Sequence, residues 1–213
     1  MSRAIFAVIG LLVVAWTPLQ ASSAIPATRH LQYSLNTTVS GLVQSAVVDL
    51  DVGAFDEAER SPVVLSERLV DADLGRESVT LDRTGAIRGA STALTFEERV
   101  LLDALALQFE NMRRVARGAQ WDLTSEESLG TQTMHVSVLK SIARDQIDLA
   151  ISQTTAFLDG AIGNWSGRIR YDTAIIVPTS IFIVGQMPVG APAARHLGAI
   201  TLSAKLIGDS FSP

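Results

Sequence analysis

The sequence predicts an α+β domain in which one long helix packs on the concave face of a long, curved antiparallel sheet of about eight or nine strands. Two observations predict this fold. One segment has helical periodicity, and most of the remaining chain alternates apolar and polar residues with the period of a strand. Because few helices are available as crossovers, neighbouring strands should be antiparallel. A closed antiparallel barrel with an external helix is the alternative.

The composition is that of a globular domain with its own packed core. The chain has 213 residues, of which 47% are hydrophobic and 18% charged, a balance that argues against intrinsic disorder. It contains no cysteine, which excludes a disulfide framework, a thiolate metal site and a cysteine nucleophile. The formal net charge of −5 argues against nucleic acid as a partner.

Residues 1–24 have the pattern of a signal peptide, which leaves residues 25–213 as a single α+β domain. Arg3 precedes the apolar run Ala4–Trp16, and small residues lead up to Ala24. The run would cover about 20 Å as a helix, which is shorter than a hydrocarbon core of about 30 Å. The sequence therefore predicts cleavage after Ala24, export to the periplasm or medium, and no transmembrane span in the mature chain.

The predicted helix covers Thr95–Arg117. Thr95 and Glu98 have the spacing of a capping box at its start, and Gly118 is a natural stop after its end. The apolar side chains form two stripes on the helical wheel rather than one. The first stripe contains Leu101, Leu105, Phe109 and Met112; the second contains Phe96, Val100, Ala104 and Leu107.

The polar arc of this helix is narrow, and consists of Arg99, Asp103, Glu110 and Arg113. Because a flat sheet covers only one apolar stripe, a second stripe indicates either a helix held in a concave surface or a face that meets another molecule. Both stripes being core is an equally acceptable interpretation.

Among the strands, the best-defined hairpin is formed by Thr131–Ile142 and Ile147–Ser152. Apolar residues alternate with polar ones in both segments. The register that makes their apolar faces coincide places Val138 opposite Ile151.

No recognisable set of catalytic residues is present. The sequence lacks a nucleophile elbow, a phosphate-binding glycine loop and histidines at metal-ligand spacing. His135 lies on the polar face of a strand and would serve as a base or a ligand only if another segment brought a carboxylate near it. Asp49 and Asp51 lie one strand step apart and could share a proton or a cation. We therefore predict no catalytic residue, no metal site and no cofactor.

Three classes of function remain. The first is an exported, non-enzymatic protein that binds an apolar ligand, a lipid or an acyl chain, between sheet and helix. The second is a structural or partner-binding envelope protein, and the third is a hydrolase with a site assembled from scattered residues. For the first class, the second helical stripe and the facing strands give the candidate ligand-binding residues Phe96, Val100, Leu107, Val138, Ile151 and Ile183.

Overall fold

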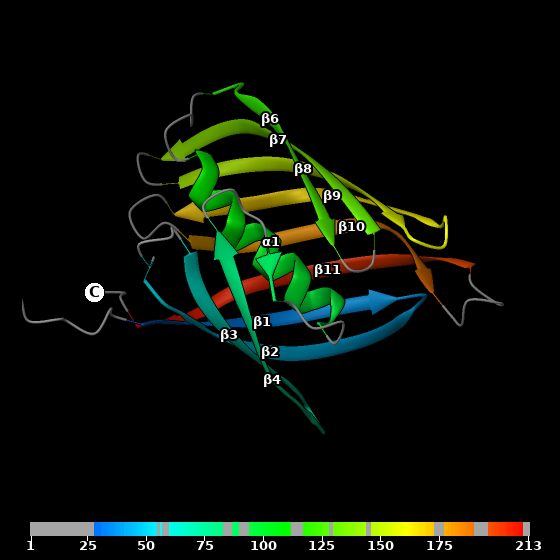
Figure 1. Cartoon of the computed structure of the whole chain (residues 1–213), viewed down its shortest axis with the longest axis horizontal. Coiled ribbons are helices and arrows are strands. Elements are labelled where there is room, and N and C mark those ends of the chain that lie inside the picture. The colour runs from blue at the N-terminus through cyan, green and yellow to red at the C-terminus, as the bar shows by residue number, and fades with distance from the viewer. Residues whose placement is uncertain are drawn as a thin grey trace, which may run out of the picture.

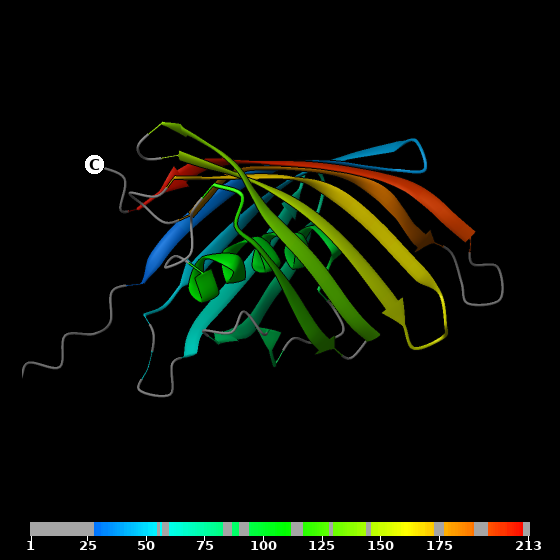
Figure 2. The same cartoon turned by 90° about the horizontal axis from the view of Figure 1, so that it is seen from above.

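The computed structural model describes residues 28–54, 56, 60–82, 87–89, 94–111, 117–127, 130–143, 146–172, 177–189 and 196–210. In this part of the chain, an 11-stranded antiparallel sheet curves around one α-helix. Figure 2 shows the sheet arching over the helix, which lies on the concave side. The predicted α+β class, with a curved antiparallel sheet and a helix on its concave face, is confirmed. The predicted signal peptide lies outside the described residues.

Among the described residues, five strands precede the helix and six follow it. The first group is β1 (Arg29–Val39), β2 (Leu42–Val52), β3 (Arg60–Leu69), β4 (Asp73–Asp82) and β5 (Ile87–Arg88). The helix α1 covers Phe96–Asn111. The second group is β6 (Gln120–Glu127), β7 (Gly130–Ala143), β8 (Gln146–Phe157), β9 (Ile162–Asp172), β10 (Val177–Val189) and β11 (His196–Asp209).

The two groups are meanders that join at the middle of the sheet. The spatial order is β5-β4-β3-β2-β1-β11-β10-β9-β8-β7-β6, so the first and last strands pair with each other (Figure 1). Within the described residues, β5 and β6 each pair with one neighbour only, and the sheet is open. The alternative of a closed barrel with an external helix is therefore wrong.

Glycines in the strands allow the backbones to approach closely where the sheet bends. A Cβ atom added at Gly185 would lie 2.5 Å from the Cβ atom of Trp165 on the neighbouring strand β9. A larger residue would force these strands apart. Together with the right-handed twist of the strands, this close approach helps the sheet to wrap around the helix.

The predicted number of strands, eight or nine, is too low, and β6 is a strand that the sequence pattern did not reveal. In β6, only Trp121 and Leu123 carry the apolar alternation, and the strand ends in acidic residues. Two alternating apolar residues in an otherwise polar segment do not distinguish a strand from a loop. Pairing with the long strand β7 stabilises it, and this contact is not visible in local sequence.

The predicted register of the β7–β8 hairpin is also wrong, by two residues. Val138 pairs with Leu149, and Val136 pairs with Ile151. The difference arises at two irregularities in the pairing, between Val138 and Lys140 and between Ser141 and Ala143, because a bulge adds a residue to one strand. A shift by two residues conserves the face, so Val138 and Ile151 both remain buried on the concave side.

The start of α1 agrees with the prediction, but its end does not. The Thr95 N–H donates to Glu98 Oε2 at 2.9 Å, and the Glu98 N–H donates to Thr95 Oγ1 at 3.1 Å, which is a complete capping box. The helix has 16 residues and ends at Asn111, and Arg117 already belongs to a turn. The predicted long helix reaching Arg117 is therefore wrong; residues 112–116 lie outside the described residues.

The sheet covers α1 from more than one side. The helix contacts β10 as well as β4 and β5, which lie on opposite sides of the central β1–β11 pair in the sheet. Its buried apolar residues are Val100, Leu101, Leu102, Ala104, Leu105, Ala106 and Leu107. Arg99 belongs to the predicted polar arc of the helix, which would leave it in solvent, but it is only 9% exposed. That assignment is wrong because a curved sheet covers a wider arc of the helix than a flat one.

Two buried tyrosines donate hydrogen bonds to backbone carbonyl oxygens, and one of these bonds joins α1 to the sheet. The Tyr171 hydroxyl on β9 donates a hydrogen bond to the carbonyl oxygen of Ala104 in α1. The Tyr33 hydroxyl on β1 donates to the carbonyl oxygen of Pro178 at 2.8 Å. Burial raises the pKa of both phenols, so both remain donors.

In the part of the chain that the structure describes, no helix has the length and apolar character needed to cross a bilayer.

Candidate functional site

A cavity of about 150 Å³ lies between the N-terminal half of α1 and strands β7–β10. The helix contributes Phe96 and Val100, which belong to the second apolar stripe. The sheet side and the segment before the helix contribute further apolar side chains, namely Leu94, Phe157, Trp165 and Met187. Most of the exposed wall is therefore apolar, and a hydrophobic molecule is the kind of ligand that such a wall favours.

One wall of this cavity is polar and is built by an amide–hydroxyl cluster. Gln153 Nε2 on β8 donates to Gln132 Oε1 at 2.9 Å and to Thr155 Oγ1 at 3.4 Å. Gln153 and Thr155 are each only 5% exposed. Gln153 Oε1 is buried and has no hydrogen-bond partner among the described residues. A buried acceptor without a partner is uncommon, because its desolvation is not compensated.

Two charged residues of α1 also line the cavity, Arg99 and Asp103. They have opposite signs and lie one helical turn apart. The other lining residues are uncharged, so the formal charge around the cavity sums to zero.

The structure brings two of the six predicted ligand-binding residues to this cavity. Phe96 and Val100 line it. The other four are buried in the apolar core and do not line it, and these are Leu107, Val138, Ile151 and Ile183. The C-terminal half of the second helical stripe, Ala104 and Leu107, is therefore packed as core, and the cavity lies at the N-terminal half of the stripe.

Sequence reasoning missed the residues on the sheet side of the cavity, although one signal was available. Gln153 has the same parity along β8 as Leu149 and Ile151, so it is a polar residue in an apolar series. A polar side chain on a buried face needs either a partner or a role in binding.

A buried carboxylate fixes the start of the helix to the sheet. Glu67 follows Val63 and Leu65 on the concave face of β3 and is 0% exposed. Its Oε2 accepts a hydrogen bond of 2.8 Å from the Thr95 hydroxyl, which in turn accepts from the N–H of Glu98. Glu67 Oε1 is buried and has no hydrogen-bond partner among the described residues.

The pKa values of the Glu67 and Glu98 carboxyl groups are both raised above their ordinary value. Burial raises the pKa of Glu67, and the negative charges of Glu97 and Glu98 add to this effect. Burial likewise raises the pKa of Glu98, with contributions from Glu77 and Glu97. The free energy of unfolding should therefore depend on the protonation of Glu67 and Glu98, and this dependence tests whether both are buried at the helix start.

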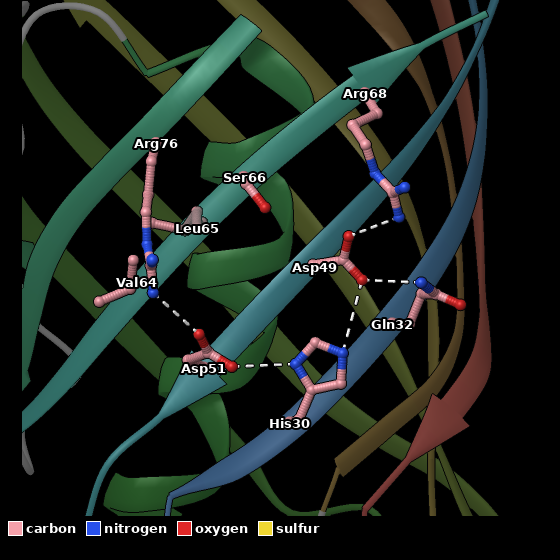
Figure 3. A pocket seen from close by; sticks show the side chains of 9 residues that line it. All are labelled: His30, Gln32, Asp49, Asp51, Val64, Leu65, Ser66, Arg68 and Arg76. Carbon is pink, nitrogen blue, oxygen red and sulfur yellow. Dashed lines mark hydrogen bonds and ion pairs between the residues drawn. The ribbon is translucent and has the colours of Figure 1, made fainter. Parts of the chain in front are cut away.

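The convex side of the sheet, away from the helix, carries a separate polar hollow of about 400 Å³ (Figure 3). His30 lies between two carboxylates, with Nδ1 2.9 Å from Asp51 Oδ1 and Nε2 3.6 Å from Asp49 Oδ1. Arg68 binds Asp49 at 2.8 Å, and Arg76 binds Asp51 at 3.1 Å. The two aspartates noted in the sequence thus bind a histidine and two arginines rather than each other.

The pairings in this hollow give it the character of a surface ion-pair network. His30, Arg68 and Arg76 are 50%, 55% and 67% exposed, and ion pairs at such exposure contribute little to stability. Ser66 also lines the hollow, but no hydrogen bond joins its hydroxyl to the His30 ring among the described interactions. Within the described residues, no group of three or more metal-ligating side chains is arranged to hold a metal ion.

The structure also supplies the carboxylate that a role for His135 would require. Asp122 on β6 lies next to it, with Oδ1 2.6 Å from His135 Nδ1. The two side chains are 47% and 67% exposed, and they lie on the convex side, opposite the cavity. His196 is exposed at the start of β11. Neither histidine lines either of the two hollows described above.

Comparisons with known proteins give little support for a family assignment. No family model matches the chain, and no curated protein matches it. A solved structure described as "Lipid-protein interactions in lipovitellin" is similar, with a TM-score of 0.48 and 12% sequence identity. The match covers 89% of this chain and 26% of that one, so this chain spans about a quarter of that protein's length.

Proposed function

We propose that the protein is an exported, non-enzymatic binding protein that holds the apolar end of a lipid, or another apolar molecule, between α1 and the sheet. The observation that carries this proposal is the cavity of about 150 Å³. On its helix side are Phe96 and Val100; on its sheet side are Trp165 and Met187.

The size of the cavity limits what it can hold. An apolar cavity of about 150 Å³ accepts a molecule the size of benzene, or about six carbon atoms. The end of an acyl chain or a single ring fits, whereas pockets that enclose a whole drug-sized ligand are about 300–1,000 Å³. Each methylene that leaves water contributes about 0.8 kcal/mol, so burial of about six carbons favours binding by about 5 kcal/mol before the entropic cost of association.

The exported location rests on residues 1–24. The basic start at Arg3, the apolar run and the small residues before Ala24 are typical of a secretory signal. An exported binding protein for apolar molecules is consistent with this pattern, since such molecules need a carrier in an aqueous compartment.

The two other classes of function have weaker support. Large apolar side chains such as Leu42, Leu158 and Leu197 are exposed among the described residues, but exposed apolar residues are common in folded proteins and do not by themselves indicate a partner surface. For a hydrolase, the cluster around His30 lacks a hydroxyl hydrogen-bonded to the ring among the described residues. The cavity on the concave side therefore supports binding best.

Displacement of a fluorescent fatty acid tests the proposed function. The wild type should bind the probe in a saturable manner and release it when an unlabelled fatty acid is added. Val100→Phe fills the cavity from the helix side and should weaken binding about tenfold or more, because the lost volume removes room for several carbons. Val184→Phe makes the same change at a position 43% exposed on β10 and should leave binding unchanged. Equal binding by all three proteins, or none by the wild type, would contradict the proposal.

A further inference from the structure

We propose that the preferred ligand is a neutral molecule that carries a hydroxyl group, and that Gln153 recognises this hydroxyl. This inference rests on the proposed function, since it concerns the ligand of the same cavity. It names the chemical class of that ligand: a small alcohol or phenol, or the hydroxyl-bearing end of a larger apolar molecule.

The position of Gln153 is the first argument. Its side chain lines the cavity and is 5% exposed, so bulk water does not solvate the amide. Two hydrogen bonds engage Nε2, with Gln132 and Thr155 as acceptors. Oε1 is buried without a partner among the described residues. A ligand that supplies a hydrogen bond here removes an uncompensated desolvation cost, whereas a purely apolar ligand retains it.

The hydrogen-bonding capacity of a hydroxyl is the second argument. The amides of Gln132 and Gln153 bind each other, and both can rotate by 180° and keep that bond. In one orientation Gln153 offers the cavity an acceptor, and in the other it offers a donor. A hydroxyl both donates and accepts, so it satisfies Gln153 in either orientation. A carboxylate only accepts, and an ammonium group only donates.

The charge around the cavity is the third argument. Arg99 and Asp103 both line the cavity and have opposite charges. The net charge of the lining is therefore zero, and it attracts neither an anion nor a cation. A charged ligand would lose its hydration without a net counter-charge, which is costly in a site that is mostly apolar. The site therefore favours a neutral polar group.

Phenol and toluene form a matched pair of probes for this inference. Both contain one six-membered ring, and a cavity of about 150 Å³ accepts a ring of this size. They differ in that phenol has a hydroxyl where toluene has a methyl group. In a cavity without a polar partner, toluene binds better, because phenol loses its hydrogen bonds to water.

Isothermal titration calorimetry of both probes with the full mature chain tests the proposal. The wild type should bind phenol at least as tightly as toluene. Gln153→Leu should bind toluene at least as well as the wild type does and should bind phenol about tenfold more weakly or worse. Gln153→Met, with an unbranched apolar side chain, gives the same test if the leucine variant does not fold. Gln186→Leu, at an exposed position on β10, is the control and should bind both probes like the wild type.

The outcomes separate this inference from the proposed function. If the wild type binds toluene clearly more tightly than phenol, the cavity binds apolar molecules but the hydroxyl preference is wrong; a water molecule then satisfies Gln153. If the loss of Gln153 weakens both probes equally, the residue shapes the cavity and does not recognise a hydroxyl. If the wild type binds neither probe, the proposed function itself fails, and this inference fails with it.

Discussion

Replacement of Glu67 by glutamine should stabilise the protein at neutral pH. Glu67 is a fully buried acid on β3 that fixes the start of α1 through the Thr95 hydroxyl. Glu67→Gln keeps the shape of the side chain and a carbonyl oxygen that can accept the same hydrogen bond, but it removes the negative charge. We expect a gain of about 1–2 kcal/mol in the free energy of unfolding near pH 7.

This magnitude is the balance of three effects. A buried charged acceptor without a partner, such as Glu67 Oε1, costs more than the about 1–3 kcal/mol of a neutral buried polar group. The glutamine NH2 that takes the place of this oxygen still has no partner among the described residues, so only the additional cost of the charge is removed. The charges of Glu97 and Glu98 add repulsion, since both contribute to the raised pKa of Glu67. Against these, a negative charge at a helix N-terminus is stabilised by about 0.3–1 kcal/mol. The unfavourable effects are larger, so removal of the charge stabilises the fold.

The pH dependence has a defined sign. Folding raises the pKa of Glu67 above the ordinary value of 4.5, so the folded protein holds a proton more tightly than the unfolded chain. Between these two pKa values the free energy of unfolding falls as pH rises. The advantage of Glu67→Gln should therefore be largest above the folded-state pKa and should disappear below 4.5, where the wild-type carboxyl is protonated in both states.

Urea denaturation of the wild type and Glu67→Gln, near pH 7 and near pH 4, measures this difference. Asp71→Asn removes a charge at an exposed position and serves as the control, with an expected change below about 0.5 kcal/mol. If Glu67→Gln lowers the free energy of unfolding by more than about 1 kcal/mol near pH 7, the charge itself stabilises the helix start. The reasoning about desolvation would then be refuted.

Three further predictions concern the core, the attachment of the helix and export. Leu105→Ala, at a fully buried position of α1, should lower the free energy of unfolding by about 2–5 kcal/mol in urea melts; a loss under about 1 kcal/mol would show that the helix does not pack as described. Tyr171→Phe removes the hydrogen bond to the Ala104 carbonyl and should cost about 1 kcal/mol by the same measurement; an unchanged value would mean that this bond adds nothing. N-terminal sequencing of the exported protein should give a start just after Ala24, and an intact Met1 in a membrane fraction would contradict the signal peptide.

The class of the fold was predictable because the information is local. Alternation along the strands and the capping box of Thr95 and Glu98 depend on neighbours in the chain, and both appear in the structure. The burial of Arg99 was not predictable in this way, because it depends on how far the sheet curves around the helix. That curvature depends on contacts between distant strands, such as the approach of Gly185 to Trp165.

The candidate site was partly predictable for the same reason. The two apolar stripes of the helix pointed to Phe96 and Val100, which line the cavity. On the sheet side, the sequence did not distinguish the residues that line the cavity from Val138 and Ile151, which are packed in the core. The pairing of His135 with Asp122 joins two strands whose register was unknown from the sequence.

The most direct test of the central claim, that an apolar ligand occupies the space between α1 and the sheet, is an NMR measurement of contacts between toluene and the protein. At saturating toluene, nuclear Overhauser effects should connect its protons with the Val100 and Met187 methyl groups and the Trp165 ring, all of which line the cavity. The methyl groups of Val48, buried elsewhere in the core, should show none. Absence of contacts to Val100 and Trp165, or contacts confined to exposed side chains such as Phe182, would contradict the claim.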